Sequence, residues 1–177
     1  MQLPPPAPRI LIVEPYLNGL AVLARRLGDA GYRVIARSSA SDAVSELHRA
    51  PVHLLLAELR MSPISGIDLT RLVRDDSLLR DLPVILINGR SDSNGSCDAL
   101  AAGADDIVTK PFDFDILVAK VRRAIARARS MTELRADNAT LDARVVTRAI
   151  ELGEVRAALE ASESERVRLA SQISASA

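Results

Sequence analysis

Four polar residues stand at or beside the ends of short apolar runs. Such runs are typical of strands that a parallel sheet buries on both faces. Because the carboxyl ends of parallel strands meet at one edge of the sheet, the four side chains should lie close together. A carboxylate and an ammonium group at such an edge can offset each other's charge as an ion pair, for example between Glu58 and Lys110. The complete set is Glu14, Glu58, Asn88 and Lys110.

The elements that would position these residues follow from the hydrophobic periodicity. Short apolar runs predict strands, and apolar residues spaced three and four apart predict helices. Five strand–helix units in succession predict an α/β fold, a doubly wound parallel sheet with helices on both faces and right-handed crossovers. Strands are expected at residues 10–13, 33–36, 54–59, 83–87 and 107–108, and helices at 17–30, 41–49, 67–74, ahead of 103, and from 113 onward.

Two of the helix starts depend on local residue types. Ser41 is the expected N-cap of the second helix, because a serine side chain can accept a hydrogen bond from the first turn. The helix ahead of Gly103 opens with residues 93–96, which are all weak helix formers. We therefore expect this helix to start late or to be mobile.

The composition excludes several classes of protein. The chain of 177 residues has a formal net charge of zero, with 15 basic and 15 acidic residues in 1–126 and 8 of each in 127–177. Neither part has the basic excess of a nucleic-acid-binding surface, so no nucleic-acid partner is expected. The single cysteine, Cys97, allows no disulfide within the chain. With no apolar run of membrane-spanning length and no signal peptide, we expect a cytoplasmic protein without a membrane partner.

Three segments of the chain differ in character. Residues 1–8 form a proline-rich leader that can join neither a helix nor the interior of a sheet. Residues 9–127 hold the strand–helix units. Residues 128–177 show no further strand signal and predict a helical coiled-coil extension. Since no glycine or proline lies between Phe114 and Leu152, the last helix of the domain should run directly into this extension.

The extension carries a heptad pattern over residues 131–173, in which nine of the 13 a and d positions are apolar. Asn138 occupies an a position, where a buried amide pair favours a parallel two-stranded register at a cost in stability. We therefore predict a homodimer formed by a parallel coiled coil. A single helix that folds back onto the globular domain is the alternative. The seam residues expected in the dimer are Leu134, Asn138, Leu141, Val145, Leu152, Val155 and Leu159.

Four motifs carry a resemblance to a known family. They are ILIVEP at 10–15, HLLLAELRMSPISG at 53–66, PVILING at 83–89 and GADDIVTKPF at 103–112, of which the last is the most specific. Over residues 9–127 the chain resembles the receiver domains of response regulators. The resemblance implies a flavodoxin-like (βα)5 fold with strand order 2-1-3-4-5. It also implies a cis peptide bond between Lys110 and Pro111.

The family's site implies phosphoryl transfer from a histidine kinase. Two acids after the first strand and an acceptor Asp after the third bind Mg²⁺, which demands oxygen ligands in near-octahedral geometry. The Asp accepts the phosphoryl group, a lysine neutralises its oxygens, and a Thr or Ser donates a hydrogen bond to them. An aromatic residue in the fifth strand follows the resulting movement. By this resemblance Glu14 matches the first acid and Lys110 matches the lysine.

The other positions depart from the family's pattern. Pro15 replaces the second acid, and Glu58 replaces the acceptor Asp with a carboxylate one methylene further out. Asn88 replaces the Thr or Ser, and Ile107 stands where the aromatic residue is expected. Together these changes remove a metal ligand, displace the nucleophile and delete both parts of the conformational relay. We therefore expect no catalytic residue and no cofactor, with Mg²⁺ binding weak or absent.

The expected function is that of an atypical response regulator in bacterial two-component-type signalling. It would be independent of phosphorylation, would not be an enzyme, and would act as a dimeric interaction module for an unidentified signalling protein. The alternatives are an active phosphoacceptor that uses Glu58, and the regulatory front end of a longer effector such as a cyclic-dinucleotide enzyme or a kinase. Glu58 either mimics a phosphoryl group or only pairs with Lys110. The last receiver helix could add a dimer contact through Asp105, Asp106, Lys120, Arg122 and Arg123.

Overall fold

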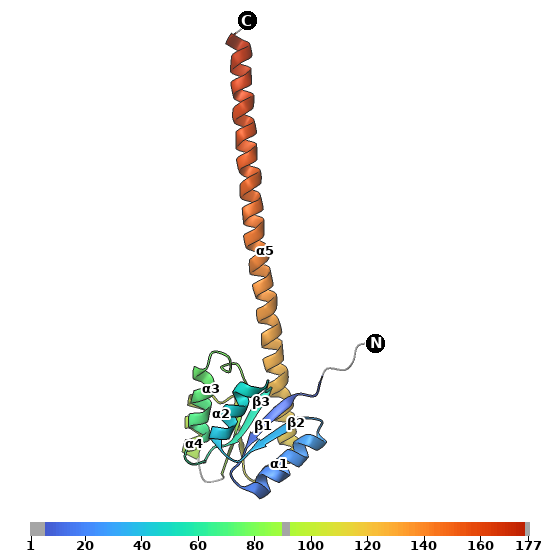
Figure 1. The fold of residues 1–177 in the computed structure, drawn as a ribbon, viewed down its shortest axis with the longest axis vertical. Coiled ribbons are helices and arrows are strands. Elements are labelled where there is room, and N and C mark those ends of the chain that lie inside the picture. The colour runs from blue at the N-terminus through green and yellow to red at the C-terminus, as the bar shows by residue number, and fades with distance from the viewer. Residues whose placement is uncertain (1–5, 90–92, 176–177) are drawn as a thin grey trace. The chain divides into compact units, whose positions relative to one another are not determined.

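The computed structural model describes residues 6–89 and 93–175. Strands and helices alternate along the chain, and the last helix, with 62 residues, is the longest (Figure 1). The elements are β1 (Arg9–Val13), α1 (Leu17–Asp29), β2 (Arg33–Arg37), α2 (Ala40–Arg49), β3 (Leu54–Glu58), α3 (Gly66–Asp75), β4 (Val84–Asn88), α4 (Ser93–Ala101), β5 (Asp106–Thr109) and α5 (Phe114–Ala175).

The five strands form one parallel sheet in the order β2-β1-β3-β4-β5, which confirms the predicted fold class and strand order. β1 lies between β2 and β3, and its last residue, Val13, is opposite Ala57. Glu14 and Glu58 therefore leave neighbouring strands at the same edge of the sheet. On the next pair of strands, Asn88 is opposite Thr109.

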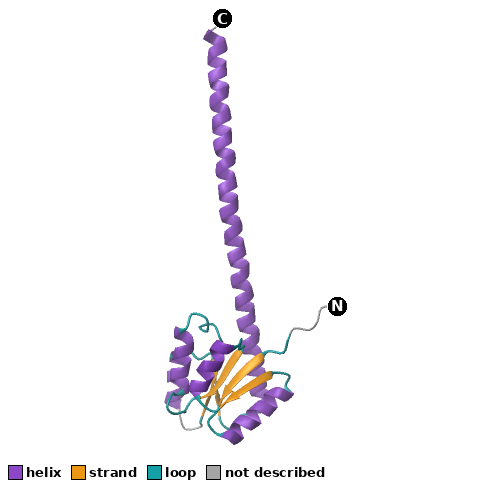
Figure 2. Cartoon of the chain, viewed as in Figure 1, coloured by secondary structure: helices purple, strands orange, loops and turns teal. Residues whose placement is uncertain are grey.

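Helices cover both faces of the sheet (Figure 2). α1 and α5 pack on one face, where Ile12 of β1 meets Leu23 and Leu117 in a buried cluster. α2, α3 and α4 pack on the other face, where Leu11 of the same strand meets Leu69 in a second cluster. Every residue of β3 and β4 is buried, because both faces are covered. This two-sided burial explains why these strands are continuous apolar runs.

The predicted cap of α2 is wrong, and the late start predicted as one alternative for α4 is not observed. Ser39, not Ser41, caps α2, because Ser39 has the extended backbone of an N-cap and its Oγ accepts from the Asp42 N–H at 3.1 Å. Ser41 lies inside the helix. α4 does not start late, since it includes its weak helix formers from residue 93, and the burial of Ala99 in the core outweighs their low propensity. Its mobility stays a prediction.

Gly66 allows α3 to begin directly against the end of β3. A Cβ atom at this position would lie 2.5 Å from the backbone oxygen of Glu58 and 2.9 Å from the Cα of Leu59. Only glycine allows the start of α3 to lie this close to the end of β3 without displacing the backbone. The Gly66 N–H also donates to the Leu59 carbonyl at 2.9 Å. The start of α3 is thus held close to the position of Glu58.

Residues 131–177 form a unit distinct from residues 1–130, and its described part is helical. The continuous helix from Phe114 confirms the predicted run of the last receiver helix into the extension. Large apolar side chains in water call for a partner surface, but the coiled-coil dimer and its fold-back alternative both stay predictions. The exposed apolar seam residues are Met131, Leu134, Leu141, Val145, Leu152, Val155 and Leu159.

Within the described residues, no helix is long and apolar enough to cross a membrane.

Candidate functional site

An ion trio occupies the carboxyl edge of the sheet. The Lys110 Nζ donates hydrogen bonds to Glu14 Oε2 at 2.7 Å and to Glu58 Oε2 at 2.6 Å. The two carboxylates come from the ends of β1 and β3 and are buried, whereas the Lys110 side chain is 39 % exposed. The register of β1 against β3 sets the two acids side by side, and the lysine after β5 reaches across both.

The other carboxylate oxygen of Glu14 is also engaged. Glu14 Oε1 accepts a hydrogen bond from the Tyr16 backbone N–H at 3.1 Å. Gly19, in the first turn of α1, lies beside this carboxylate, since a Cβ there would be 3.4 Å from it, at van der Waals contact. Between these residues, Pro15 carries no oxygen in its side chain. The loop after β1 therefore offers one side-chain carboxylate, and that carboxylate is already bound.

Burial and charge act in opposite directions on this trio. Burial raises the pKa of Glu58, and the hydrogen bond from Lys110 offsets that rise only in part. For Lys110, burial alone would lower the pKa, but hydrogen bonds to Glu14 and Glu58 outweigh it and raise the pKa. Lys110 therefore remains an ammonium ion.

The positions of the family's conformational relay hold side chains of a different kind. The Asn88 Nδ2 donates to Ser96 Oγ at 2.9 Å, which links the end of β4 to α4. The backbone N–H of Lys110 donates to the Asn88 carbonyl at 2.7 Å. Ile107, in β5, is half-buried and packs against the cluster under α2, α3 and α4. The Lys110–Pro111 peptide bond is cis, and so is Ser62–Pro63, which no prediction named.

Residues 10–122 match the family model of the response regulator receiver domain. The chain belongs to this family. It is 34% identical over 125 residues to the transcriptional regulatory protein KdpE of Mycobacterium tuberculosis, a match that covers 71% of this chain and 54% of that relative. It is 29% identical over 125 residues to the phosphate regulon transcriptional regulatory protein PhoB of Escherichia coli, with 71% and 55% covered.

Solved receiver structures have the same fold. The structure of a putative response regulator from Chloroflexus aurantiacus has a TM-score of 0.66 and 27% identity, covering 68% of this chain and 98% of that one. The signal receiver domain of a histidine kinase from Syntrophus aciditrophicus has a TM-score of 0.64 and 31% identity, covering 68% and 91%. This receiver chain spans about half the length of the curated relatives that it matches.

The residues present do not fit the magnesium ion of the family. A receiver's Mg²⁺ needs several free carboxylate oxygens in near-octahedral geometry. Here Glu14 and Glu58 each accept a hydrogen bond from Lys110, and Pro15 stands at the position of the second acid. Within the described ranges, no group of three or more His, Cys, Asp or Glu side chains could hold a metal ion. The ammonium of Lys110 supplies the positive charge between the two carboxylates.

The acids predicted at a dimer contact bind partners inside the receiver. Asp105 Oδ2 accepts from Arg74 Nη2 and from the Val84 backbone N–H, both at 2.8 Å. Asp106 Oδ1 accepts from Lys120 Nζ at 2.6 Å. Sequence reasoning missed Arg74, because no spacing rule connects residues 31 positions apart. The remaining two predicted contact residues, Arg122 and Arg123, are exposed.

A histidine away from the site joins α2 to the loop after α3. His48 Nδ1 lies 3.0 Å from the Val44 carbonyl and Nε2 lies 2.8 Å from Asp76 Oδ2, so both nitrogens face acceptors. Only a protonated ring donates from both. The hydrogen bond to Val44 and then that to Asp76 raise the pKa of His48. His53, by contrast, accepts from the Arg9 backbone N–H at 3.0 Å, consistent with a structural role.

The pKa of His48 should therefore lie above its ordinary value of 6.5. Since the folded state binds this proton more tightly, the stabilisation is complete below the unfolded pKa and is lost as pH rises through the folded pKa. A proton NMR titration of the two histidine rings measures it directly. Asp76→Asn should move the His48 midpoint toward 6.5. An unchanged His48 midpoint would show that the Asp76 contact does not form in solution.

Proposed function

We propose that this receiver is an atypical response regulator that works without phosphorylation and relays signals as a dimeric interaction module. The observation that carries the proposal is the bridge from Lys110 to both Glu14 and Glu58. In a phosphorylated receiver, the equivalent lysine must be available to the phosphoryl oxygens. In this chain, two buried carboxylates already neutralise it.

The charge at the site opposes an incoming phosphodonor. The trio holds two carboxyl groups and one ammonium, and its residues do not fit the divalent cation that would offset a carboxylate's repulsion of a phosphoryl group in a partly desolvated site. The Glu58 oxygen nearest the lysine is engaged in a hydrogen bond of 2.6 Å. Attack on phosphorus also requires alignment to within a fraction of an ångström, and the additional methylene of Glu58 displaces the nucleophile.

This chain also lacks the side chains that report phosphorylation in the family. Asn88 presents an amide in place of a hydroxyl, and this amide is bonded to Ser96 of α4. Ile107 is an aliphatic side chain in place of an aromatic one. Together with the neutralised lysine, these side chains favour a single constant state of the receiver. Mimicry by Glu58 has less support, because the side chains that would respond to it are missing.

The tail supports the dimeric part of the proposal. Seven of its a and d side chains, between residues 131 and 159, are apolar and exposed in the single chain, and they extend over several heptads of one continuous helix. A second copy with the same pattern can bury them as a coiled coil, with Asn138 paired across the seam. The constant receiver would then be presented to its signalling partner in two copies.

The proposal is tested by the intact mass of the protein after incubation with a small-molecule phosphodonor and Mg²⁺. The wild type should gain no phosphoryl group. The double variant Glu58→Asp/Pro15→Asp, which restores the acceptor and the second acid, should gain one. Phosphorylation of the wild type would instead establish the second candidate function, a phosphoacceptor that uses Glu58.

A further inference from the structure

A second apolar stripe runs along α5 beyond residue 130, roughly opposite the predicted seam. Its members fall at the b and f positions of the heptads, alternately three and four residues apart, which is the spacing of a coiled-coil contact. All of them are exposed, and the two large side chains, Val146 and Ile150, are 60 % and 59 % exposed. This b/f stripe consists of Ala136, Ala139, Ala143, Val146, Ile150, Gly153 and Ala157.

Contacts within the chain do not account for the b/f stripe. Gly153 lies in the interior of α5, where glycine is less favourable than alanine. A Cβ atom at this position would meet nothing within 4 Å, so no contact in the described part of the chain requires glycine here. A second helix that approaches closely would explain both the small residues and the exposed Val146 and Ile150, because the distance between packed helices depends on the side chains at their contact.

A second copy of the b/f stripe fits against the first in an antiparallel register. When Val146 lies opposite Ile150 of the second copy, two-fold symmetry also places Ile150 opposite Val146. The two large side chains of each copy then meet at the centre of the contact. The same register brings the small residues together, Ala143 with Gly153 and Ala139 with Ala157.

The charged residues beside the b/f stripe favour this antiparallel register. In such a pairing, e positions of one copy lie beside e positions of the other. Asp142 therefore comes next to Arg156 of the second copy. By the same geometry, Arg135 comes next to Glu163. Symmetry repeats each of these contacts, so the register contains four pairs of opposite charge.

A parallel pairing of the b/f stripe lacks these ion pairs. It would set each flanking residue beside the one five positions further along the other copy. Asp142 would then meet Thr147, and Arg156 would meet Ala161. Within the single chain Arg156 binds Glu160 at 3.3 Å, but both side chains are largely exposed. Such a pair on a helix surface is weak, so it competes little with Asp142 of a second copy.

We propose that the b/f stripe binds the b/f stripe of a second copy in antiparallel orientation. This contact goes beyond the proposed function, because it lies away from the predicted seam and joins dimers to one another. Each dimer would present the stripe twice, which allows assemblies larger than a pair of dimers. Since most of its members are Ala or Gly, the stripe buries less apolar area than the seam. Its contact therefore forms at higher protein concentration than the dimer.

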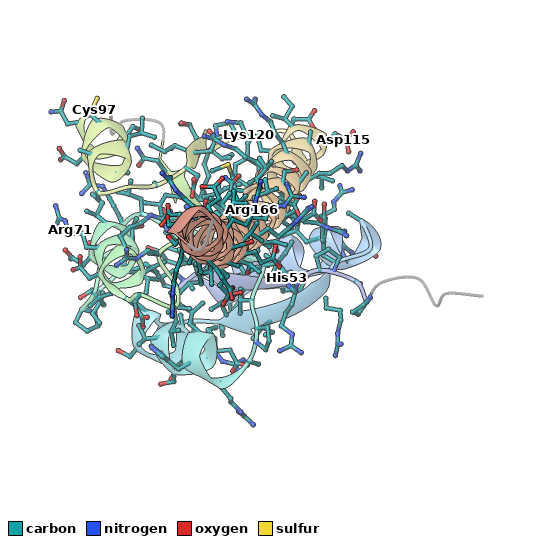
Figure 3. All side chains as sticks on the ribbon, turned by 90° about the horizontal axis from the view of Figure 1, so that it is seen from above. His53, Arg71, Cys97, Asp115, Lys120 and Arg166 are labelled. Carbon is teal, nitrogen blue, oxygen red and sulfur yellow. The ribbon has the colours of Figure 1, made fainter. Side chains whose placement is uncertain are left out.

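Disulfide trapping in the full chain tests the register. In the antiparallel pairing Thr147, at a c position beside the stripe, lies next to Thr147 of the second copy. Thr147→Cys should therefore give disulfide-linked chains in oxidised glutathione. The single native cysteine, Cys97, is exposed on α4 (Figure 3) and is replaced by serine in every trapping variant.

Thr140→Cys is the matched control for this trapping. Thr140 also occupies a c position, and the hydroxyl groups of Thr140 and Thr147 each donate to the carbonyl four residues earlier at 3.0 Å. In the antiparallel register the two copies of residue 140 are about 24 Å apart along the helix axis, at 1.5 Å per residue. Thr140→Cys should therefore give no linked chains.

Sedimentation velocity over a concentration series tests the assembly itself. The wild type should be a dimer at low concentration and should form larger species as the concentration rises. Val146→Lys/Ile150→Lys should weaken the association of dimers by about a hundredfold or more, because it places like charges at the centre of the contact. In the same background, Thr147→Cys should no longer be trapped.

Four results would overturn the inference. Equal trapping at residues 140 and 147 would indicate unspecific or parallel contacts, and no trapping at residue 147 would exclude the register. A wild type that stays a dimer at every concentration would leave the b/f stripe to a helix of another protein. A monomer at every concentration would show that the tail folds back onto its own receiver. The phosphodonor assay of the proposed function is independent of all four results.

Discussion

Replacing Lys110 by methionine should lower the free energy of unfolding by roughly 3 kcal/mol, near the low end for breaking a buried ion pair. The variant leaves Glu14 and Glu58 side by side at the sheet edge without the ammonium between them. Glu14 is fully buried and Glu58 nearly so, which makes their mutual repulsion costly. The expected loss of unfolding free energy is near the low end of the range for buried ion pairs because Lys110 itself is partly exposed. Urea denaturation of the full chain measures it.

A matched control separates this effect from the loss of any ion pair. Lys120→Met removes the ion pair with Asp106. The side chains of Lys120 and Asp106 are each about a third exposed. This variant should lose about 1 kcal/mol or less, as exposed pairs do. Equal losses in the two variants would contradict the view that the trio is a buried and coupled site.

The penalty in Lys110→Met should shrink in acid. Burial already raises the pKa of Glu58, and without Lys110 nothing opposes that rise except its remaining hydrogen bond. A carboxyl whose folded pKa is raised contributes stability below its unfolded pKa, and this contribution is lost as pH rises through the folded pKa. Measured from about pH 7 down to about pH 5, the difference between variant and wild type should therefore decrease. If the difference in unfolding free energy stays constant with pH, the variant is destabilised by lost packing and not by uncompensated charge.

The sequence was sufficient to predict the sheet, because its parallel strands are buried on both faces and appear as apolar runs. Glu58 and Lys110 could be placed together for the same reason. The hydrogen bond from Lys110 to Glu14 depends on how the Glu14 carboxylate is oriented toward the lysine. Strand order alone does not determine this orientation. Arg74 of α3 binds Asp105, just before β5, through a tertiary contact that leaves no trace in local spacing. The cap of α2 was misplaced because several serines near its start are chemically equivalent, and only backbone geometry selects Ser39.

The exposed seam of α5 leads to the second large effect. Leu141→Lys/Leu152→Lys should convert the proposed coiled-coil dimer to monomers, because the two substitutions remove four seam leucines from each dimer and introduce like charges. At about 1.5 kcal/mol for each buried leucine, the dissociation constant should rise roughly 10⁴-fold. Sedimentation equilibrium of the full chain measures the change. The receiver unit should keep its fold, since both residues lie beyond residue 130.

The helix itself provides the control for this experiment. Val146 and Ile150 are 60 % and 59 % exposed, close to Leu141 at 53 % and Leu152 at 70 %. They fall at b and f positions, roughly opposite the seam at 100° per residue. Val146→Lys/Ile150→Lys should therefore leave the dimer intact while adding the same charges. If both double variants dissociate alike, general apolar association holds the chains together and the heptad seam does not. If neither dissociates, the tail is not the dimer contact, and the receiver would have to provide one.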